Sequence, residues 1–268
     1  MPHKYFSIDG VATYVQHTGT TTLPDVPPDL GRGESVVCLH GAGGNSGLFS
    51  DVLNGLAAAH SPLSFDQPAH GRSAGLDSLG SIERMSAFSR ALLGKLGIEH
   101  PVLLGHSLGG AVALQCALDA APAVRALVLV GAVVRNPVPD DFLEFARRLS
   151  EGKERRRFAR EGYAAGTSPD IMRRGFMEDM KTDPRATYGD LLAARDCDFS
   201  DALGGLEMPT LVIVGEEEAA PIVAQADLVV ERVRDARKVT IPKAGHMVPI
   251  EQAEALCEAV NGFLGELS

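Results

Sequence analysis

The chain alternates short apolar runs with longer helical runs, and this alternation limits the folds that it can adopt. The expected strands are Tyr5–Ile8, Ala12–His17, Val36–Leu39, Leu63–Asp66, Val102–Leu104, Ala126–Val130, Leu211–Val214 and Lys238–Ile241. Helical runs follow most of them, at 47–59, 82–96, 108–120, 221–234 and 249–267. Strands that are apolar almost throughout, with helices between them, predict a mostly parallel sheet buried on both faces. The sequence therefore favours an α/β fold.

Two segments depart from the alternation. Ile8-Asp-Gly-Val11 joins the first two strands and is a hairpin signal, so this edge of the sheet is expected to be antiparallel. The segment 134–205 has no good strand, several amphipathic helical stretches and five of the ten phenylalanines. We expect a helical cap over a ligand cavity there, inserted into a core formed by 1–133 and 206–268. The same aromatic residues would also suit packing within the cap itself.

Composition and charge exclude several classes of partner. The 268 residues are 45% apolar and 22% charged, as in a soluble globular protein. A formal net charge of −10 argues against nucleic acid or an anionic membrane as the main partner, and no apolar run is long enough for a membrane span. The N-terminus does not resemble a signal peptide. Four widely spaced cysteines without metal-ligand spacing predict reduced thiols in a cytoplasmic protein, with no metal and no cofactor: Cys38, Cys116, Cys197 and Cys257.

Gly-His-Ser-Leu-Gly-Gly at 105–110 lies between an expected strand and an alanine-rich helical run. Glycines on both sides of Ser107 permit a sharp turn that would present its hydroxyl at the top of the sheet. The helix start behind it offers backbone N–H groups and the positive end of a helix dipole. The stretch therefore predicts a nucleophile elbow with Ser107 as the nucleophile.

Three further motifs accompany the elbow in a fixed order. They are His40-Gly-Ala-Gly-Gly-Asn-Ser46, Phe65-Asp-Gln-Pro-Ala-His-Gly-Arg-Ser73 and Ile241-Pro-Lys-Ala-Gly-His-Met-Val-Pro249. With these four motifs, over nearly its whole length, the chain resembles the α/β-hydrolase superfamily, as a small serine esterase-like member with a helical cap. The resemblance implies an eight-stranded, mostly parallel sheet flanked by helices, with an inserted cap. Ala69 stands where the family commonly has glycine.

The resemblance also implies the parts of a catalytic site. Ser107 would be the nucleophile and His246 its base, since an unperturbed imidazole pKa near 6.5 suits a base at neutral pH. The backbone N–H groups of Ala42 and Leu108 would form an oxyanion hole. Five other motif residues are expected to have structural roles: His40, Asp66, His70, Arg72 and His106.

The acid of the expected triad departs from the family pattern. The family usually has Asp in G-x-x-D after a strand such as Leu211–Val214, and Glu218 occupies this position after Gly215. Glu218 precedes His246 by 28 residues, a typical separation for the family. A glutamate can serve, since the acid orients the imidazole and stabilises its cation, but its extra methylene requires the loop to adapt. Glu217 as the acid, or a merely solvated acidic loop, stay open.

A basic cluster lies within the expected cap. The window 147–160 has seven Lys or Arg residues against two acidic residues, a net charge of +5. Arg155, Arg156 and Arg157 would suit docking of an anionic acyl carrier, such as acyl carrier protein or the phosphates of coenzyme A. A solvated helix face is the alternative. We expect none of these three arginines near Ser107.

Together these features predict a serine hydrolase whose partner is a small-molecule carboxylic ester, thioester or lactone with an apolar acyl part. Two other functions stay open. One is hydrolysis of a carbon–carbon bond in a vinylogous diketone, as in relatives that process products of aromatic ring cleavage. The other is a non-catalytic binding protein of the same fold, because a fold does not by itself select a function.

Overall fold

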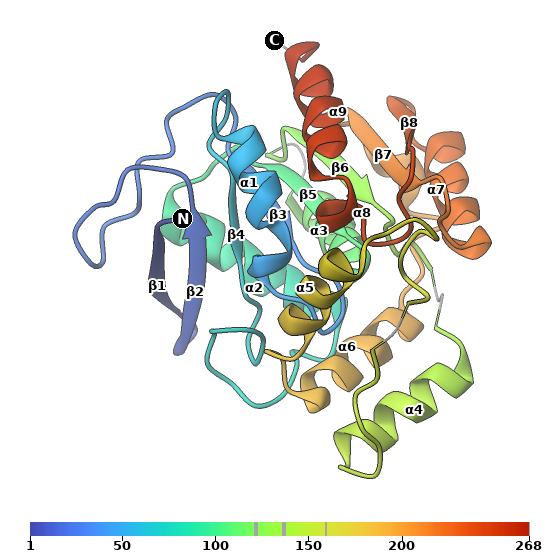
Figure 1. The fold of residues 1–268 in the computed structure, drawn as a ribbon. Coiled ribbons are helices and arrows are strands. Elements are labelled where there is room, and N and C mark those ends of the chain that lie inside the picture. Colours follow the sequence, from blue (N-terminus) through green and yellow to red (C-terminus); the bar gives the residue numbers. More distant parts are fainter. Residues whose placement is uncertain (121–122, 136–137, 159, 268) are drawn as a thin grey trace.

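The computed structural model describes residues 1–120, 123–135, 138–158 and 160–267. In this part of the chain eight strands form one sheet, in the order β1-β2-β4-β3-β5-β6-β7-β8 (Figure 1). Their bounds are β1 His3–Ile8, β2 Val11–His17, β3 Val36–Leu39, β4 Leu63–Phe65, β5 Val102–His106, β6 Ala126–Val130, β7 Thr210–Gly215 and β8 Ala236–Ile241. The predicted α/β fold with eight strands is confirmed.

The N-terminal edge of the sheet is antiparallel, as the hairpin signal predicts. β1 pairs with β2 antiparallel, with Ile8 opposite Val11, and β2 pairs with β4 antiparallel. The two residues between them, Asp9 and Gly10, have φ values of +48° and +80°. A two-residue turn with positive φ at both positions matches the twist of the flanking strands. The other neighbouring strands pair in parallel.

Helices cover both faces of the sheet, and every residue of β3 to β7 is buried as a result. Alternate residues of β3 belong to opposite cores: Val37 and Leu39 to one, Val36 and Cys38 to the other. The first core takes side chains from α2 (Ile82–Leu96), α3 (Leu108–Ala120) and α7 (Ala220–Arg232). The second takes them from α1 (Ser50–Leu56), α8 (Val248–Glu251) and α9 (Ala253–Gly265).

Two of the expected helical runs are interrupted. The run 47–59 begins as a short 3₁₀ turn, Ser46–Phe49, and continues as α1, which ends at Leu56. The run 249–267 divides into α8 and α9 at Gln252, whose φ of −140° and ψ of 51° lie outside the helical region. The Gln252 side chain donates a hydrogen bond to the carbonyl oxygen of Lys243, and this bond ties the break to the loop before α8.

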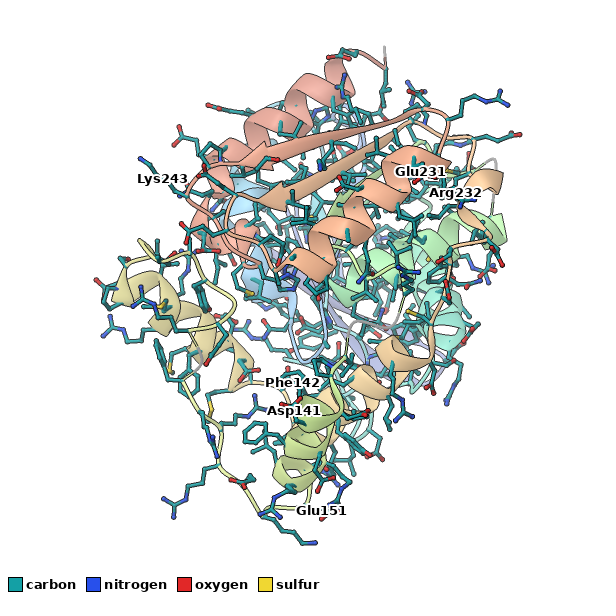
Figure 2. All side chains as sticks on the ribbon, turned by 90° about the vertical axis from the view of Figure 1, so that its right-hand side faces the viewer. Asp141, Phe142, Glu151, Glu231, Arg232 and Lys243 are labelled. Atoms are coloured by element: carbon teal, nitrogen blue, oxygen red, sulfur yellow. The ribbon has the colours of Figure 1, made fainter. Side chains whose placement is uncertain are left out.

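The chain between β6 and β7 contributes α4 (Asp140–Ser150), α5 (Pro169–Asp179) and α6 (Pro184–Asp196). We call the described part of 138–205 the cap segment; residues 136, 137 and 159 of the expected cap lie outside the described residues. Figure 2 shows Phe142 at the end of α4 nearer the sheet and Glu151 beyond its far end. The division into a core and a cap at 134–205 stays a prediction. None of the helices described is both long and apolar enough to cross a membrane.

Glycines let the start of α3 approach the sheet closely. A Cβ on Gly109 would lie 2.1 Å from the carbonyl oxygen of Leu39, at the end of β3. A Cβ on Gly105 would lie 2.3 Å from the carbonyl oxygen of Gly109. The turn between β5 and α3 is therefore as tight as the elbow motif predicts, and Ser107 lies at its tip.

The variant Gly109→Ala is expected to have a free energy of unfolding lower by roughly 1–3 kcal/mol, because the added methyl meets a backbone oxygen that cannot move aside. The matched control is Gly94→Ala in α2, where a Cβ meets nothing within 4 Å. This control should gain about 0.5–1 kcal/mol, since alanine restricts the unfolded chain more than glycine does. Urea unfolding of both variants measures the difference, and equal stabilities would contradict the close approach.

Candidate active site

Ser107 occupies a strained backbone conformation between β5 and α3. Its φ is +54°, in the left-handed region that serine rarely adopts. Its amide donates to the carbonyl oxygen of Val130 at 3.0 Å, and its carbonyl oxygen accepts from the amides of Gly110 (2.9 Å) and Val133 (3.0 Å). Hydrogen bonds from the neighbouring strand and helix thus hold the conformation, as strained functional turns require.

His246 and Glu218 form a hydrogen-bonded pair, with 2.8 Å between Nδ1 and Oε2. Because a carboxylate only accepts, Nδ1 carries the hydrogen of this bond, and in the neutral ring the lone pair is then on Nε2. The Glu218 side chain is 1% exposed and that of His246 is 25% exposed. Burial works to raise the pKa of Glu218, but the hydrogen bond and the charge of His246 outweigh it, and this pKa lies below its usual range. The acid is therefore ionised at neutral pH.

The neighbouring glutamate points to a different partner. Glu217 accepts a hydrogen bond from the amide of Ala165, in the cap segment, at 2.7 Å. Glu218 also accepts from the amide of Ala219 at 2.9 Å, which fixes the second oxygen of its carboxylate. Of the two glutamates that the sequence offers, the structure brings Glu218 to His246.

Two buried side chains hold the backbone around His246. His106 donates from Nε2 to the carbonyl oxygen of His246 at 2.9 Å, and burial lowers the pKa of His106 to about 3, so its ring is neutral. Glu251 accepts from the amides of Gly245 (2.9 Å) and Ala164 (2.8 Å). Sequence reasoning missed Glu251; its only signal in the sequence is a charged residue at the end of the apolar run that begins at Val248.

The predicted oxyanion donors are the backbone amides of Ala42 and Leu108. Leu108 is the first residue of α3, so its N–H has no acceptor within the helix. Gly44 donates to the carbonyl oxygen of Gly41 at 3.0 Å, and this closes a turn around Ala42. Neither the Ala42 nor the Leu108 amide donates to any residue that the structure describes.

A cavity of about 430 Å³ joins Ser107, His246 and the loop 41–44, within the usual size of small-molecule pockets. Ser107 and His246 share no hydrogen bond here; in free enzymes such contacts often tighten only with substrate. Most of the apolar side chains that line the cavity come from the cap segment, namely Phe142, Phe145, Leu149, Met172, Phe176 and Leu191. Leu48 and Met247 complete the apolar lining from outside the cap segment. Its polar lining includes Arg156, Arg157, Tyr163, Asp179 and Thr187.

The sequence did not predict that Arg156 and Arg157 line the same cavity as Ser107. The Arg156 side chain is only 11% exposed and pairs with the Asp179 carboxylate at 2.6 Å. It also donates to the carbonyl oxygens of Asp179 and Thr182. These bonds attach the segment that follows α4 to the end of α5 and the turn between α5 and α6. Arg157 remains 72% exposed and lies over the Phe145 ring.

Much of the positive charge of the window 147–160 is balanced locally. Arg147 pairs with Glu144 and Glu151, Lys153 with Glu151, and Arg148 with Glu154, and most of these side chains are well exposed. Arg155 has neither an ion pair nor a hydrogen bond to any described residue. Docking of an anionic acyl carrier at Arg155, Arg156 and Arg157 stays a prediction.

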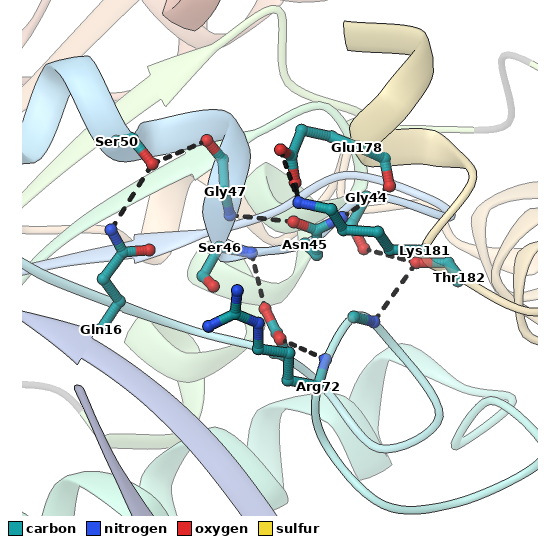
Figure 3. Close-up of polar contacts among 12 residues, drawn as sticks. Gln16, Gly44, Asn45, Ser46, Gly47, Ser50, Arg72, Glu178, Lys181 and Thr182 are labelled. Carbon is teal, nitrogen blue, oxygen red and sulfur yellow. Dashed lines mark hydrogen bonds and ion pairs between the residues drawn. The ribbon is translucent and has the colours of Figure 1, made fainter. Parts of the chain in front are cut away.

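The turn from Phe65 to Ser73 is braced as the sequence predicts. Asp66 accepts from the amides of Ser46 (2.6 Å) and Arg72 (2.7 Å), which ties this turn to the loop 41–47 (Figure 3). His40 donates from Nδ1 to the carbonyl oxygen of Gly41 at 2.9 Å and accepts at Nε2 from the Gln67 amide at 3.1 Å.

His70 makes an ion pair that sequence reasoning missed. Its Nδ1 faces the carbonyl oxygen of Pro68 at 2.9 Å, and its Nε2 faces the Asp190 carboxylate at 2.8 Å. Because both partners only accept, the ring carries both hydrogens and is an imidazolium. Burial works to lower the pKa of His70, but Asp190 outweighs it and this pKa is raised. The only signal for Asp190 is an acid among the apolar residues of a helical run.

The four cysteines are not among the residues that line this cavity. The four cysteines are buried and not bonded to one another. Across the described ranges, no group of three or more His, Cys, Asp or Glu side chains is arranged to hold a metal ion.

The stability that the His70–Asp190 pair contributes is expected to depend on pH. The raised pKa of His70 makes its contribution complete below the ordinary value of 6.5 and lost as the pH rises through the folded value. The lowered pKa of Asp190 makes its contribution complete above the ordinary value of 3.8 and lost as the pH falls through the folded value. Urea unfolding should show the alkaline loss in the wild type and a flatter profile in Asp190→Asn; identical profiles would contradict the pairing.

Comparison with known proteins adds sequence and structural relatives. Residues 36–259 match the alpha/beta hydrolase family. The chain is 30% identical over 250 residues to the dihydrolipoyllysine-residue acetyltransferase component of the acetoin cleaving system of Pseudomonas putida. The matched region covers 87% of this chain and 64% of that protein. It spans 12% and 32% of two other curated relatives, so it matches less than two thirds of these three proteins.

Other relatives match along almost their whole length. A 2-hydroxy-6-oxononadienedioate/2-hydroxy-6-oxononatrienedioate hydrolase of Pseudomonas sp is 25% identical over 254 residues, with 88% of this chain and 90% of that protein covered. A thermophilic esterase from Thermogutta terrifontis has a similar structure, with a TM-score of 0.84, 22% identity and coverage of 100% and 99%. The family match and these likenesses lead to one conclusion: this chain belongs to the alpha/beta hydrolase family.

Proposed function

We propose that this protein is a serine hydrolase that cleaves a carboxylic ester, thioester or lactone with an apolar acyl part. The observation that carries the proposal is the Glu218–His246 pair, bonded at 2.8 Å, on the cavity that Ser107 lines. A serine hydroxyl is a weak nucleophile until a neighbouring base takes its proton. His246 keeps the lone pair of Nε2 for that purpose, since Glu218 holds Nδ1–H.

In the first half of the reaction Ser107 Oγ attacks the carbonyl carbon as its proton passes to His246 Nε2. The resulting oxyanion receives hydrogen bonds from the amides of Ala42 and Leu108. Glu218 stabilises the imidazolium without taking a proton itself. The tetrahedral intermediate then collapses, His246 protonates the departing alcohol or thiol, and the acyl group remains on Ser107.

In the second half His246 takes a proton from water, and the hydroxide oxygen attacks the acyl carbon. The same two amides hold the second oxyanion. Collapse releases the carboxylic acid and returns the proton from His246 to Ser107 Oγ. The apolar lining from α4, α5 and α6 supports an apolar acyl or alcohol part, because burial of such a group in a pocket is favourable.

Carbon–carbon bond hydrolysis is the second candidate. The Pseudomonas sp relative is named as a 2-hydroxy-6-oxononadienedioate/2-hydroxy-6-oxononatrienedioate hydrolase, and such a dienedioate carries carboxylates. Arg157, exposed at the rim of the cavity, is a cation that would suit one. Turnover of a chromogenic dienoate against that of a p-nitrophenyl ester separates the two functions. A non-catalytic binding role has less support, because it would leave the Glu218–His246 pair without a purpose.

The variant Ser107→Ala should lose ester turnover by roughly 10⁴–10⁶-fold, since the acyl-enzyme cannot form. The wild type should gain one phosphonyl group from a fluorophosphonate, on Ser107, and the variant none. Mass spectrometry of the intact chain and its peptides measures this, with circular dichroism as the control for folding. Labelling at another serine, or full turnover by the variant, would overturn the assignment.

The variant Glu218→Gln should lower kcat by up to about 10⁴-fold, because a neutral amide neither fixes the Nδ1–H tautomer nor stabilises the imidazolium. Glu217→Gln is the matched control, with the same substitution one residue away on a side chain that binds the Ala165 amide. It should change kcat little. Steady-state kinetics on one p-nitrophenyl ester compares them, and a reversed order of effects would identify Glu217 as the acid.

A further inference from the structure

The loop that carries Ala42 is held from the cap segment as well as from the sheet. Three hydrogen bonds join the loop to residues between the end of α5 and the middle of α6. They run from the Gly43 amide to Asp190 Oδ2 (3.0 Å), from Thr182 Oγ1 to the Gly44 carbonyl oxygen (3.2 Å) and from Asn45 Nδ2 to the Glu178 carbonyl oxygen (2.9 Å). Figure 3 shows the contacts of Gly44 and Asn45 with this part of the cap segment.

Asp190 is the hydrogen-bond acceptor for the Gly43 amide, and its other partners hold its carboxylate in place. Its side chain is 2% exposed, and a carboxylate so deeply buried is costly unless it is paired and hydrogen-bonded. His70 supplies the opposite charge at Oδ2, and Ser78 donates to Oδ1 at 2.5 Å. The Gly43 amide therefore binds an ionised oxygen that its other partners immobilise, and charge-assisted bonds of this kind are stronger than neutral ones.

Gly43 also brings α6 into direct contact with the loop. Its φ is +66°, and a Cβ there would lie 2.6 Å from Oγ1 of Thr187, one turn before Asp190 on α6. Thr187 Oγ1 is buried and has no hydrogen-bond partner among the residues described, although Thr187 lines the cavity. The helix thus presents two polar side chains to one glycine of the loop.

We infer that Asp190 is a positioning residue for the oxyanion hole: by holding the Gly43 amide it sets the direction of the adjacent Ala42 amide. The Gly43 N–H belongs to the peptide that follows Ala42, so fixing it restricts the backbone torsions on which the Ala42 N–H direction depends. Oxyanion stabilisation depends on donors already aimed at the place where charge develops. The cap segment is then a structural part of the hole as well as a cover for the cavity. The inference rests on the proposed serine hydrolysis.

The test compares Asp190→Asn with Asp196→Asn. Asp196 is on the same helix, its side chain is 70% exposed, and it pairs with Arg195. Asp190→Asn should lower kcat for a p-nitrophenyl ester by roughly 10–100-fold, part of the loss seen when an oxyanion donor is removed, with KM within about twofold. The control should match the wild type. A loss confined to KM, or no loss in Asp190→Asn, would overturn the inference.

A pair of ketones isolates the oxyanion. A trifluoromethyl ketone adds to Ser107 and places an oxyanion in the hole, whereas the matching methyl ketone binds without forming one. Asp190→Asn should weaken inhibition by the first about as much as it lowers kcat and leave the second unchanged. Equal weakening of both would assign Asp190 to general packing and overturn the inference.

Hydrogen exchange tests the loop without relying on activity. Amides in the peptide that spans 41–47 should exchange faster in Asp190→Asn than in Asp196→Asn, and the peptide that spans β5 should not differ. Unchanged exchange at 41–47 would overturn the inference, even if esters are hydrolysed. The two proposals can fail separately. If exchange at 41–47 is faster in Asp190→Asn but the wild type is not labelled at Ser107 by the fluorophosphonate, the proposed function is refuted and the anchoring of the loop stands.

Ser78→Ala covers the case in which Asp190→Asn does not fold. It removes one hydrogen bond from Asp190 Oδ1, and Ser78 does not line the cavity. The variant should show the same pattern to a smaller degree: lower kcat, steady KM and faster exchange at 41–47. A fully folded Ser78→Ala with wild-type kcat and wild-type exchange would count against Asp190 as the support of the loop.

Discussion

The close approach of α3 to β3 and β5 is the constraint on which the site depends. Gly109 of α3 lies against the carbonyl oxygen of Leu39 at the end of β3. Gly105, near the end of β5, lies against the backbone of Gly109. Ser107 and the loop 41–44 continue from these two neighbouring strand ends, so the contact sets the distance between the proposed nucleophile and the proposed oxyanion donor. Parallel strands bring such ends to one edge of a sheet, where the α/β folds place their ligands.

Two carboxylate–imidazole pairs lie in this part of the molecule, and the second ring nitrogen decides what each can do. Glu218 occupies one nitrogen of His246, and the other has no hydrogen-bond partner among the described residues and belongs to a ring that lines the cavity. Asp190 and the Pro68 carbonyl occupy both nitrogens of His70, which therefore holds its charge and cannot act as a base. A carboxylate and an imidazole thus have a structural role at Asp190 and His70, whereas under the proposed function Glu218 and His246 would serve proton transfer.

Local patterns predict most of the fold because strand and helix formation follow from neighbouring residues. The bounds of β3, β6, α2 and α3 are those expected, and the Asp9-Gly10 turn sets an antiparallel edge. The place of Arg156 in the cavity lining was not predicted, because it depends on bonds to Asp179 and Thr182, which no local pattern reveals. Asp190 and Glu251 were missed for a similar reason, because their hydrogen-bond donors come from other parts of the chain. Asp190 accepts from the Gly43 amide, and Glu251 accepts from the amides of Ala164 and Gly245.

The sequence by itself determined the α/β architecture, the order of the motifs and the position of Ser107 in its turn, because periodicity, glycine placement and motif spacing are local properties. The motif spacing favoured Glu218 as the acid but left Glu217 open, and the tertiary structure decided between them, since only the path of the loop brings one of these carboxylates to His246. It also decided that Asp190 holds the loop at Gly43. These two residues are 147 positions apart, and only the folded chain brings them within hydrogen-bonding distance.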